Sequence, residues 1–131
     1  MFTPVRAFSG FSVDDLAAAK EFYGGVLGLA VVDGKGGASL RLPGGTEAWL
    51  YPKGEAHRPA GYTTLDFVVE DIDAAVDELT RRGVRFERYE NGPPQDAKGI
   101  MRGIAAGMGP DIAWFKDPAG NILAVLMQGE D

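Results

Sequence analysis

The sequence predicts an α+β fold in which two βαβββ modules form one cupped, mixed β-sheet with the helices on the outside. The main observation is an internal repeat: segment 11–19 (FSVDDLAAA) matches segment 67–75 (FVVEDIDAA) at a constant offset of 56 residues. The turn and strand at 43–51 also match those at 118–126. A chain of 131 residues suits one compact domain. We therefore expect a single domain, 1–131, with module 1 at about 1–51, a linker at about 52–61 and module 2 at about 62–131.

Each copy of the repeat predicts a strand, an Asp N-cap and an amphipathic helix. Asp15 and Asp71 stand directly before the helices, where an Asp side chain accepts hydrogen bonds from the free amides of the first turn. Apolar residues recur at helical spacing over 16–26 and 72–82, so we expect a helix in each segment. Glycines follow both segments and are typical helix stops.

The remaining segments of each module are predicted to be strands and loops. Short strands are expected at 30–33 and 38–42 in module 1, and at 85–90 and 111–116 in module 2. The last hairpin has the clearest signal, because the turn sequence DPAGN at 117–121 separates an aromatic strand end from an apolar run. Residues 91–110 form the longest irregular segment, and we expect its middle, 98–103, to act as a lid over a pocket.

Composition excludes several classes of protein. The chain has no cysteine, which rules out disulfides, thiolate catalysis and thiolate metal sites. A net charge of −6 and a pI near 4.7 disfavour nucleic-acid binding. The apolar stretches are too short to span a bilayer, and the N-terminus lacks the pattern of a secretory signal. We expect a cytoplasmic protein with a small-molecule partner and with neither nucleic acid nor membrane as a partner.

The segments 22–29 (FYGGVLGL) and 114–121 (WFKDPAGN) give the chain a resemblance to the glyoxalase/bleomycin-resistance/extradiol-dioxygenase superfamily, also called vicinal oxygen chelate proteins. The resemblance spans nearly the whole chain. It implies a metal site in the cup, with one ligand from the first and one from the last strand of each module. By the family's spacing, these four positions hold Phe8, Trp49, Thr64 and Ala124.

These four residues do not suit a metal ion. A divalent ion needs several imidazole or carboxylate donors, whereas Thr64 offers only a hydroxyl and the other three offer nothing. A shift of one residue in strand register supplies no such donor either. We therefore predict a member of the metal-free kind, with no metal and no cofactor.

Strand alternation and the loop composition predict what lines the cup instead. The candidate ligand-binding residues are Phe8, Arg41, Glu47, Trp49, Tyr51, Thr64, Asp66, Arg102 and Trp114. The two tryptophans are expected either as aromatic walls for a ligand or as core residues that fill the place of a metal. Asp66 is unusual within a strand, so we expect it to face a ligand or to pair with Arg41 or Arg102. The single histidine, His57, falls in the linker and is expected to be exposed to solvent.

The leading hypothesis is a metal-independent, small-molecule-binding protein of the glyoxalase/bleomycin-resistance type that sequesters an aromatic or cationic compound. The alternative is a metal-independent isomerase or lyase of the same fold with Asp66 or Glu47 as the general base. A regulatory module with a packed, empty cup and a metal-dependent lyase or dioxygenase are less favoured. The sequence assigns no catalytic residue and leaves open whether the chain is an enzyme. The resemblance also implies a homodimer, since paired subunits in this family often share their cups.

Overall fold

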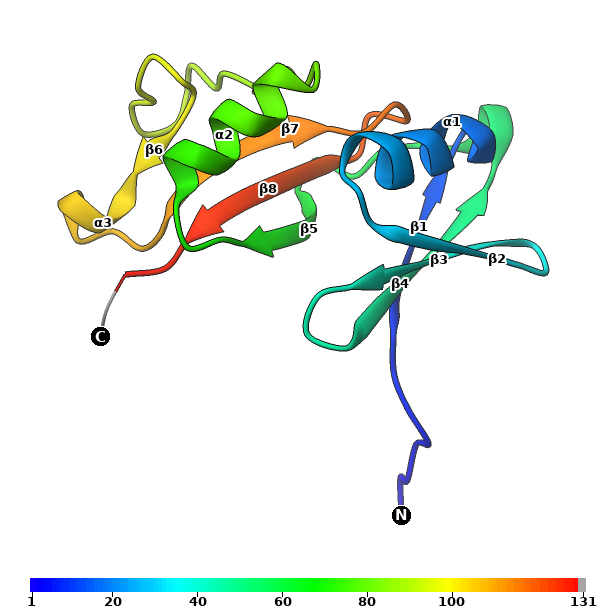
Figure 1. Ribbon diagram of the computed structural model, residues 1–131. Helices are drawn as coiled ribbons and strands as arrows, with labels where there is room; N and C mark the ends of the chain where they lie inside the picture. The colour runs from blue at the N-terminus through cyan, green and yellow to red at the C-terminus, as the bar shows by residue number, and fades with distance from the viewer. Residues whose placement is uncertain (130–131) are drawn as a thin grey trace. The chain divides into compact units, whose positions relative to one another are not determined.

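The computed structural model describes residues 1–129 and divides the chain into two compact units. Unit 1 is Met1–Pro59 and unit 2 begins at Ala60, so the boundary falls inside the predicted linker. Each unit contains one four-stranded mixed sheet with helices (Figure 1). The predicted α+β class and the two βαβββ modules are therefore confirmed. The last two residues of predicted module 2, 130–131, lie outside the described residues.

Unit 1 carries its strands in the order β1-β4-β3-β2, with β1 parallel to β4 and the other pairs antiparallel. Its elements are β1 (Ser9–Val13), α1 (Leu16–Lys20), the π-helix η1 (Glu21–Val26), β2 (Ala30–Gly34), β3 (Gly37–Leu42), β4 (Thr46–Pro52) and the 3₁₀ turn η2 (Gly54–Ala56). The helical segment has the predicted extent, 16–26, but its second half widens into π geometry. The Leu27 amide donates to the Phe22 carbonyl at 3.0 Å, five residues back.

Unit 2 repeats this arrangement with the strand order β5-β8-β7-β6. Its elements are β5 (Thr63–Val68), α2 (Ile72–Arg81), β6 (Met101–Arg102), α3 (Gly103–Ala106), β7 (Asp111–Lys116) and β8 (Ile122–Met127). Strand β5 runs parallel to β8, and the other two pairs are antiparallel. Among residues 1–129, no helix has both the length and the apolar character needed to cross a membrane.

The repeated Asp residues cap the two helices as predicted. Asp15 accepts a hydrogen bond from the Ala18 amide at 3.2 Å, and Asp71 accepts one from the Ala74 amide at 3.1 Å. Each side chain thereby satisfies an amide that has no partner within its helix. Gly83 follows α2 with φ +94°, the left-handed conformation that commonly ends a helix.

One face of each sheet packs against its own helix, and alternation leaves the opposite face for the candidate site. In unit 1 the buried residues are Val13, Ala38, Leu40, Ala48 and Leu50, with Ala19 and Tyr23 from the helical segment. In unit 2 they are Ala113, Phe115, Leu123 and Val125, with Ile72 and Val76 from α2. The residues between them on each strand project from the face away from the helix.

The edge of the second sheet differs from the prediction. Residues 85–90 do not form a strand, and their backbone makes one hydrogen bond to β7, from the Glu87 amide to the Trp114 carbonyl at 2.7 Å. The short strand β6 instead pairs with β7 next to this contact, through Met101 opposite Ile112 and Arg102 opposite Asp111. Two separate segments therefore share the edge that one strand was expected to occupy.

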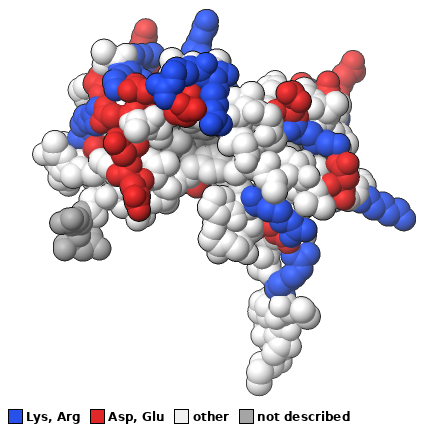
Figure 2. All heavy atoms as spheres, in the orientation of Figure 1, with Lys and Arg blue, Asp and Glu red and all other residues white. Residues whose placement is uncertain are grey.

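The segment 98–103 is held against α2 and does not form the expected lid. Lys98 lies 3.1 Å from an Asp77 oxygen, and the Arg102 guanidinium makes two bonds to the Asp73 carboxylate, at 3.0 and 2.7 Å. Ile100 between them is fully buried. Figure 2 shows the resulting mixture of basic and acidic side chains over α2. Two ion-paired side chains and a buried anchor fix the segment in place.

Candidate ligand-binding site

Four of the predicted site residues come together at a hollow on the sheet face of unit 1 that lies away from its helix. The hollow has a volume of about 220 Å³, and its lining includes Phe8, Arg41, Glu47 and Trp49. Ser39 lies opposite Trp49, and Arg41 opposite Glu47, in the pairing of β3 with β4. Strand alternation thus positions these side chains on one face, as the sequence predicted.

The Trp49 ring lies against backbone in which glycines leave room for it. A Cβ added to Gly34 would lie 2.8 Å from Trp49 Cη2, and one added to Gly37 would lie 2.7 Å from Trp49 Cζ2. Any side chain at these two positions of the β2–β3 hairpin would therefore occupy the space of the indole. The ring is half-buried and is restrained by this backbone.

Glu47 is enclosed by three donors beside Trp49. Its carboxylate accepts hydrogen bonds from Ser39 Oγ at 2.8 Å and from Arg41 Nη1 at 2.8 Å, and it pairs with the Arg6 guanidinium. The Ser39 hydrogen bond, followed by the contact with Arg6, lowers the pKa of Glu47 below its ordinary value. Glu47 therefore stays ionised at neutral pH, and its negative charge is offset, which makes it a poor general base.

Phe8 forms the outer wall of the same hollow. Its ring centroid lies 4.8 Å from the Arg6 guanidinium carbon, within the range of a cation–π contact. Arg6 thus touches both Glu47 and Phe8. Arg6 was not among the predicted site residues, and it lies before β1 in the N-terminal segment. Ser39, by contrast, follows from alternation along β3.

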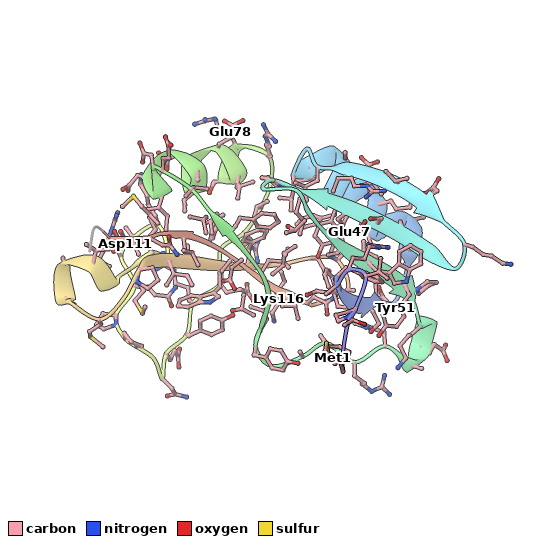
Figure 3. The ribbon with its side chains drawn as sticks, turned by 90° about the horizontal axis from the view of Figure 1, so that it is seen from below. Met1, Glu47, Tyr51, Glu78, Asp111 and Lys116 are labelled. Carbon is pink, nitrogen blue, oxygen red and sulfur yellow. The ribbon has the colours of Figure 1, made fainter. Side chains whose placement is uncertain are left out.

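Tyr51 lies further along β4 and outside the set of residues that line the hollow. It projects from the same strand face as Glu47, and both are labelled in Figure 3. Its neighbour across the sheet is Ser12. The Ser12 hydroxyl lies 2.7 Å from His57 Nδ1, and His57 is buried. The prediction of an exposed His57 is wrong, since the 3₁₀ turn brings the linker back against β1 and Ser12 gives the ring a polar partner.

The second tryptophan occupies the corresponding face of unit 2. Asp66, Ala124 and Trp114 form one row across β5, β8 and β7. Trp114 is half-buried and meets the Tyr89 ring edge-on, with centroids 5.5 Å apart. Tyr89 belongs to residues 85–90, which do not form the predicted strand. This row has one aromatic cluster and one carboxylate.

Neither Arg41 nor Arg102, the two residues considered as ion-pair partners, pairs with Asp66. Arg41 binds Glu47 instead, and Arg102 binds Asp73 and Asp96. Asp66 is exposed, and it has no salt bridge to any residue within 1–129. Desolvation by the surrounding residues raises the pKa of the Asp66 carboxyl above its ordinary value. Of the two predicted base candidates, Asp66 is thus the stronger base.

Arg102 and Thr64 lie apart from these clusters. Arg102 pairs with Asp111 on the helix side of β7, where its contacts with Asp73 and Asp96 raise its already high pKa further. Thr64 lies at an irregularity in the β5–β8 pairing, and its hydroxyl donates to the Ile122 carbonyl at 3.1 Å. The Arg102 guanidinium is thus engaged by carboxylates, and the Thr64 hydroxyl proton is used within the sheet.

The side chains present do not fit the family's divalent ion. Three of its four positions hold Phe8, Trp49 and Ala124, which have no donor atom, and the Thr64 hydroxyl is bound to the backbone. No cluster of three or more His, Asp or Glu residues suited to a metal occurs within residues 1–129. We therefore derive no chemistry through a metal from these residues.

Comparisons with known proteins agree with this architecture. A Sphaerobacter thermophilus protein of the glyoxalase/bleomycin resistance protein/dioxygenase superfamily is 25% identical, with a TM-score of 0.64 over 95% of this chain and 98% of that one. TnmS3, an antibiotic-binding protein from Streptomyces sp. CB03234, is 23% identical, with a TM-score of 0.64 over 98% and 100%. The oxidase ChaP-H2 is 21% identical, with a TM-score of 0.66 over 96% of each chain.

Curated proteins gave no match to the chain. The sequence profile described as the Glyoxalase/Bleomycin resistance protein/Dioxygenase superfamily, however, matches residues 7–125, which are most of the chain. The repeat, the two βαβββ units and this match lead to one assignment. The chain belongs to the Glyoxalase/Bleomycin resistance protein/Dioxygenase superfamily.

Proposed function

We propose that this protein binds a small aromatic compound, without a metal, in the hollow of unit 1. The observation that carries the proposal is the Trp49 indole, restrained by glycine backbone at the wall of a hollow of about 220 Å³. A fixed ring loses little conformational freedom when a ligand stacks on it. Such stacking contributes roughly 0.5–1.5 kcal/mol beyond the area buried. TnmS3 is an example of this fold in an antibiotic-binding protein.

The charges of the hollow favour a neutral or anionic ligand. Arg6 and Arg41 both contact Glu47, so two guanidinium groups meet one carboxylate. Asp33, also in the lining, pairs with Lys20. A cationic ligand, our other expectation, depends on Asp66 of unit 2, which has no ion pair among residues 1–129.

Calorimetry with three probes that share one ring system tests both points. 2-Naphthoate, 2-naphthol and 2-naphthylmethylammonium differ in charge but not in aromatic area. We expect the anion and the neutral probe to bind more tightly than the cation. Trp49→Ala should weaken 2-naphthoate binding about tenfold, equivalent to roughly 1.4 kcal/mol.

Trp114→Ala is the matched control, because it removes the same side chain from the other unit and should leave 2-naphthoate binding unchanged. An unchanged affinity in folded Trp49→Ala protein refutes the placement of the site. If the cationic probe binds more tightly than the other two, and this binding is lost in Asp66→Asn, the ligand site lies in unit 2 instead.

The enzymatic alternative is supported by one observation, the raised pKa of Asp66. The protein would then be a metal-independent isomerase or lyase in which Asp66 removes a proton from a carbon atom of the substrate. The lowered pKa of Glu47 argues against Glu47 as the base. Deuterium uptake from D₂O into aryl ketones and 2-oxo acids, followed by NMR, tests this alternative. Catalysed exchange that is lost in Asp66→Asn and kept in Glu47→Gln supports it, and the absence of exchange counts against it.

The proposal includes a cytoplasmic, homodimeric protein that holds no metal in the cup. Phe8, Trp49, Thr64 and Ala124 carry the last point, since binding needs deprotonated or imidazole donors. Elemental analysis of tag-free protein after dialysis against a weak chelator provides the test. One transition-metal ion retained per chain contradicts it.

A further inference from the structure

We propose that unit 2 contains a second ligand site, for an uncharged aromatic molecule, in a cavity between residues 93–96 and α3. The cavity has a volume of about 380 Å³. Its apolar walls are Pro93, Pro94, Ile100, Met101, Ala106 and Met108. All of its lining residues belong to unit 2, and none of them belongs to the hollow beside Trp49.

The size of the cavity suits a molecule of two or three rings. An apolar cavity of about 150 Å³ holds one benzene molecule, and ligand pockets in proteins run from about 300 to 1,000 Å³. The volume of about 380 Å³ therefore exceeds the need of a single ring and falls at the small end of ligand pockets.

The polar groups at its border are already engaged with one another. Gln95 Nε2 donates to the Glu87 and Gly99 carbonyls at 2.9 and 2.8 Å, and its oxygen accepts from the Tyr89 amide at 2.8 Å. Asp96 accepts from the Lys98 and Ile100 amides, both at 2.9 Å, and from Arg102 Nε at 3.0 Å.

Arg102, the basic residue of the lining, is neutralised in turn by Asp73. A charged ligand would therefore lose its hydration in this cavity without gaining a partner of opposite charge, which is unfavourable. Because the polar groups of the lining already have partners, the cavity disfavours a charged ligand. Its apolar walls favour a ligand with an apolar surface.

Hydrogen bonds fix the walls on both sides of the cavity. On one side, Asp96 accepts from the Ile100 amide and the Asp96 amide donates back to the Ile100 carbonyl at 2.8 Å. On the other, the Ile104 amide donates to the Asp111 carboxylate at 3.0 Å and the Met108 amide donates to the Gly103 carbonyl at 2.9 Å. The cavity is therefore formed before binding, which reduces the ordering that a ligand must cause.

Met101 and Met108 in the lining suit the cavity to a flat aromatic ring. Met side chains are unbranched and polarizable, and they make favourable contacts with aromatic rings. Met108 is 68% exposed at the rim, although it is apolar. A ligand in the cavity would cover this side chain, and the resulting burial of apolar surface favours binding.

The test uses N-phenyl-1-naphthylamine, an uncharged probe whose fluorescence rises in apolar surroundings. We expect saturable binding to the full-length protein. Ala106→Phe places a ring inside the cavity and should weaken the binding of the probe at least tenfold. Ala105→Phe is the matched control, because Ala105 is the exposed neighbour on α3 and is not part of the lining; its affinity should equal that of the parent.

A charged analogue tests the selectivity. 8-Anilino-1-naphthalenesulfonate has the same ring skeleton with an added sulfonate, and we expect it to bind at least tenfold more weakly than the uncharged probe. Equal binding of the two overturns the claim that the site takes an uncharged molecule. No saturable binding of the uncharged probe overturns the site itself.

Crossed variants separate this site from the proposed one. Trp49→Ala should leave the affinity for N-phenyl-1-naphthylamine unchanged, and Ala106→Phe should leave 2-naphthoate binding unchanged. The inference is overturned if Trp49→Ala loses affinity for the uncharged probe. It is also overturned if Ala105→Phe and Ala106→Phe lose this affinity equally.

Circular dichroism checks that each variant is folded. If Ala106→Phe is not, Met108→Glu replaces it, because that exposed position tolerates a charge in the folded protein. We expect at least fivefold weaker binding of the uncharged probe in this variant. An unchanged affinity in folded Met108→Glu protein overturns the site.

Discussion

At Gly37 the backbone of β3 passes so close to β4 that a methyl group has no room. An added Cβ would lie 2.1 Å from the Leu50 carbonyl oxygen and 2.7 Å from Trp49 Cζ2. We expect Gly37→Ala to lower the free energy of unfolding by about 2–3 kcal/mol, because the backbone must move to relieve the contact. Urea denaturation followed by circular dichroism measures the change. Gly61→Ala, which meets no atom within 4 Å, should stay within about 0.5 kcal/mol of the parent; equal losses in both variants contradict the explanation.

A second residue-scale prediction concerns Asp73 and acid stability. Its hydrogen bonds with Arg102, the largest cause, and with Lys98 lower the pKa of Asp73 from 3.8 to about 2 in the folded protein. The folded state therefore favours the ionised form. Its stabilising contribution is complete above pH 3.8 and disappears as the pH falls to about 2.

Thermal unfolding measured from pH 7 to pH 2 tests whether the stabilising contribution of Asp73 is lost as the pH falls. We expect Asp73→Asn to lower the midpoint at pH 7 and to make the difference from the parent vanish near pH 2. Glu70→Gln is the control, because Glu70 is exposed and has no salt bridge among residues 1–129. A difference between Asp73→Asn and the parent that stays constant across the range contradicts the prediction.

Residue-level prediction from the sequence succeeded where a local rule decides the outcome. The Asp caps follow from their position before a helix, and the common face of Arg41, Glu47 and Trp49 follows from alternation. It failed where two distant segments meet. His57 is buried because the linker returns to Ser12, 45 residues earlier in the chain, and no local pattern encodes that contact.

At the scale of the element, the stability of α2 depends on its first turn. Asp71 accepts a hydrogen bond from the Ala74 amide at 3.1 Å. Asp71→Ala removes this acceptor and should lower the free energy of unfolding by about 1 kcal/mol. Asp71→Asn keeps an equivalent acceptor and should retain most of the stability. Urea unfolding of the three proteins measures both effects, and an equal loss in the Ala and Asn variants shows that the charge, not the cap, stabilises the helix.

The elements that the sequence predicted well are those with a long periodic pattern. Both helices, the last strand of each unit and β7 have such patterns, and their extents match closely. Strand β6 has two residues, too few for any period, so the sequence placed the edge at 85–90 instead. Two segments contact the free edge of β7: residues 85–90 through the Glu87 hydrogen bond to Trp114, and β6 through the pairing of Met101 with Ile112.

At the scale of the whole molecule, the repeat predicted the two βαβββ modules, and the segments 22–29 and 114–121 predicted the family. The two proposed ligand sites were harder to predict, because each includes contacts from outside the repeat. Arg6 completes the Glu47 cluster from the N-terminal segment, and the cavity of unit 2 forms where residues 93–96 pack beside α3. Both segments lie where the two copies no longer match in sequence. Both proposed sites therefore depend on parts of the chain that are not repeated.

The predicted homodimer is the remaining question at this scale, and the exposed apolar residues favour it. Phe8 is 54% exposed and Val68 on β5 is 61% exposed, each on or next to a sheet. Exposed apolar side chains of this kind often mark protein interfaces.

We expect light scattering at high micromolar concentration to give twice the chain mass of 13.9 kDa. Val68→Lys should shift the protein toward the monomer, because a buried unpaired ammonium is unfavourable, whereas Lys35→Glu, a change at an exposed hairpin position, should not. A monomer mass for the parent protein at this concentration removes the dimer from the proposal.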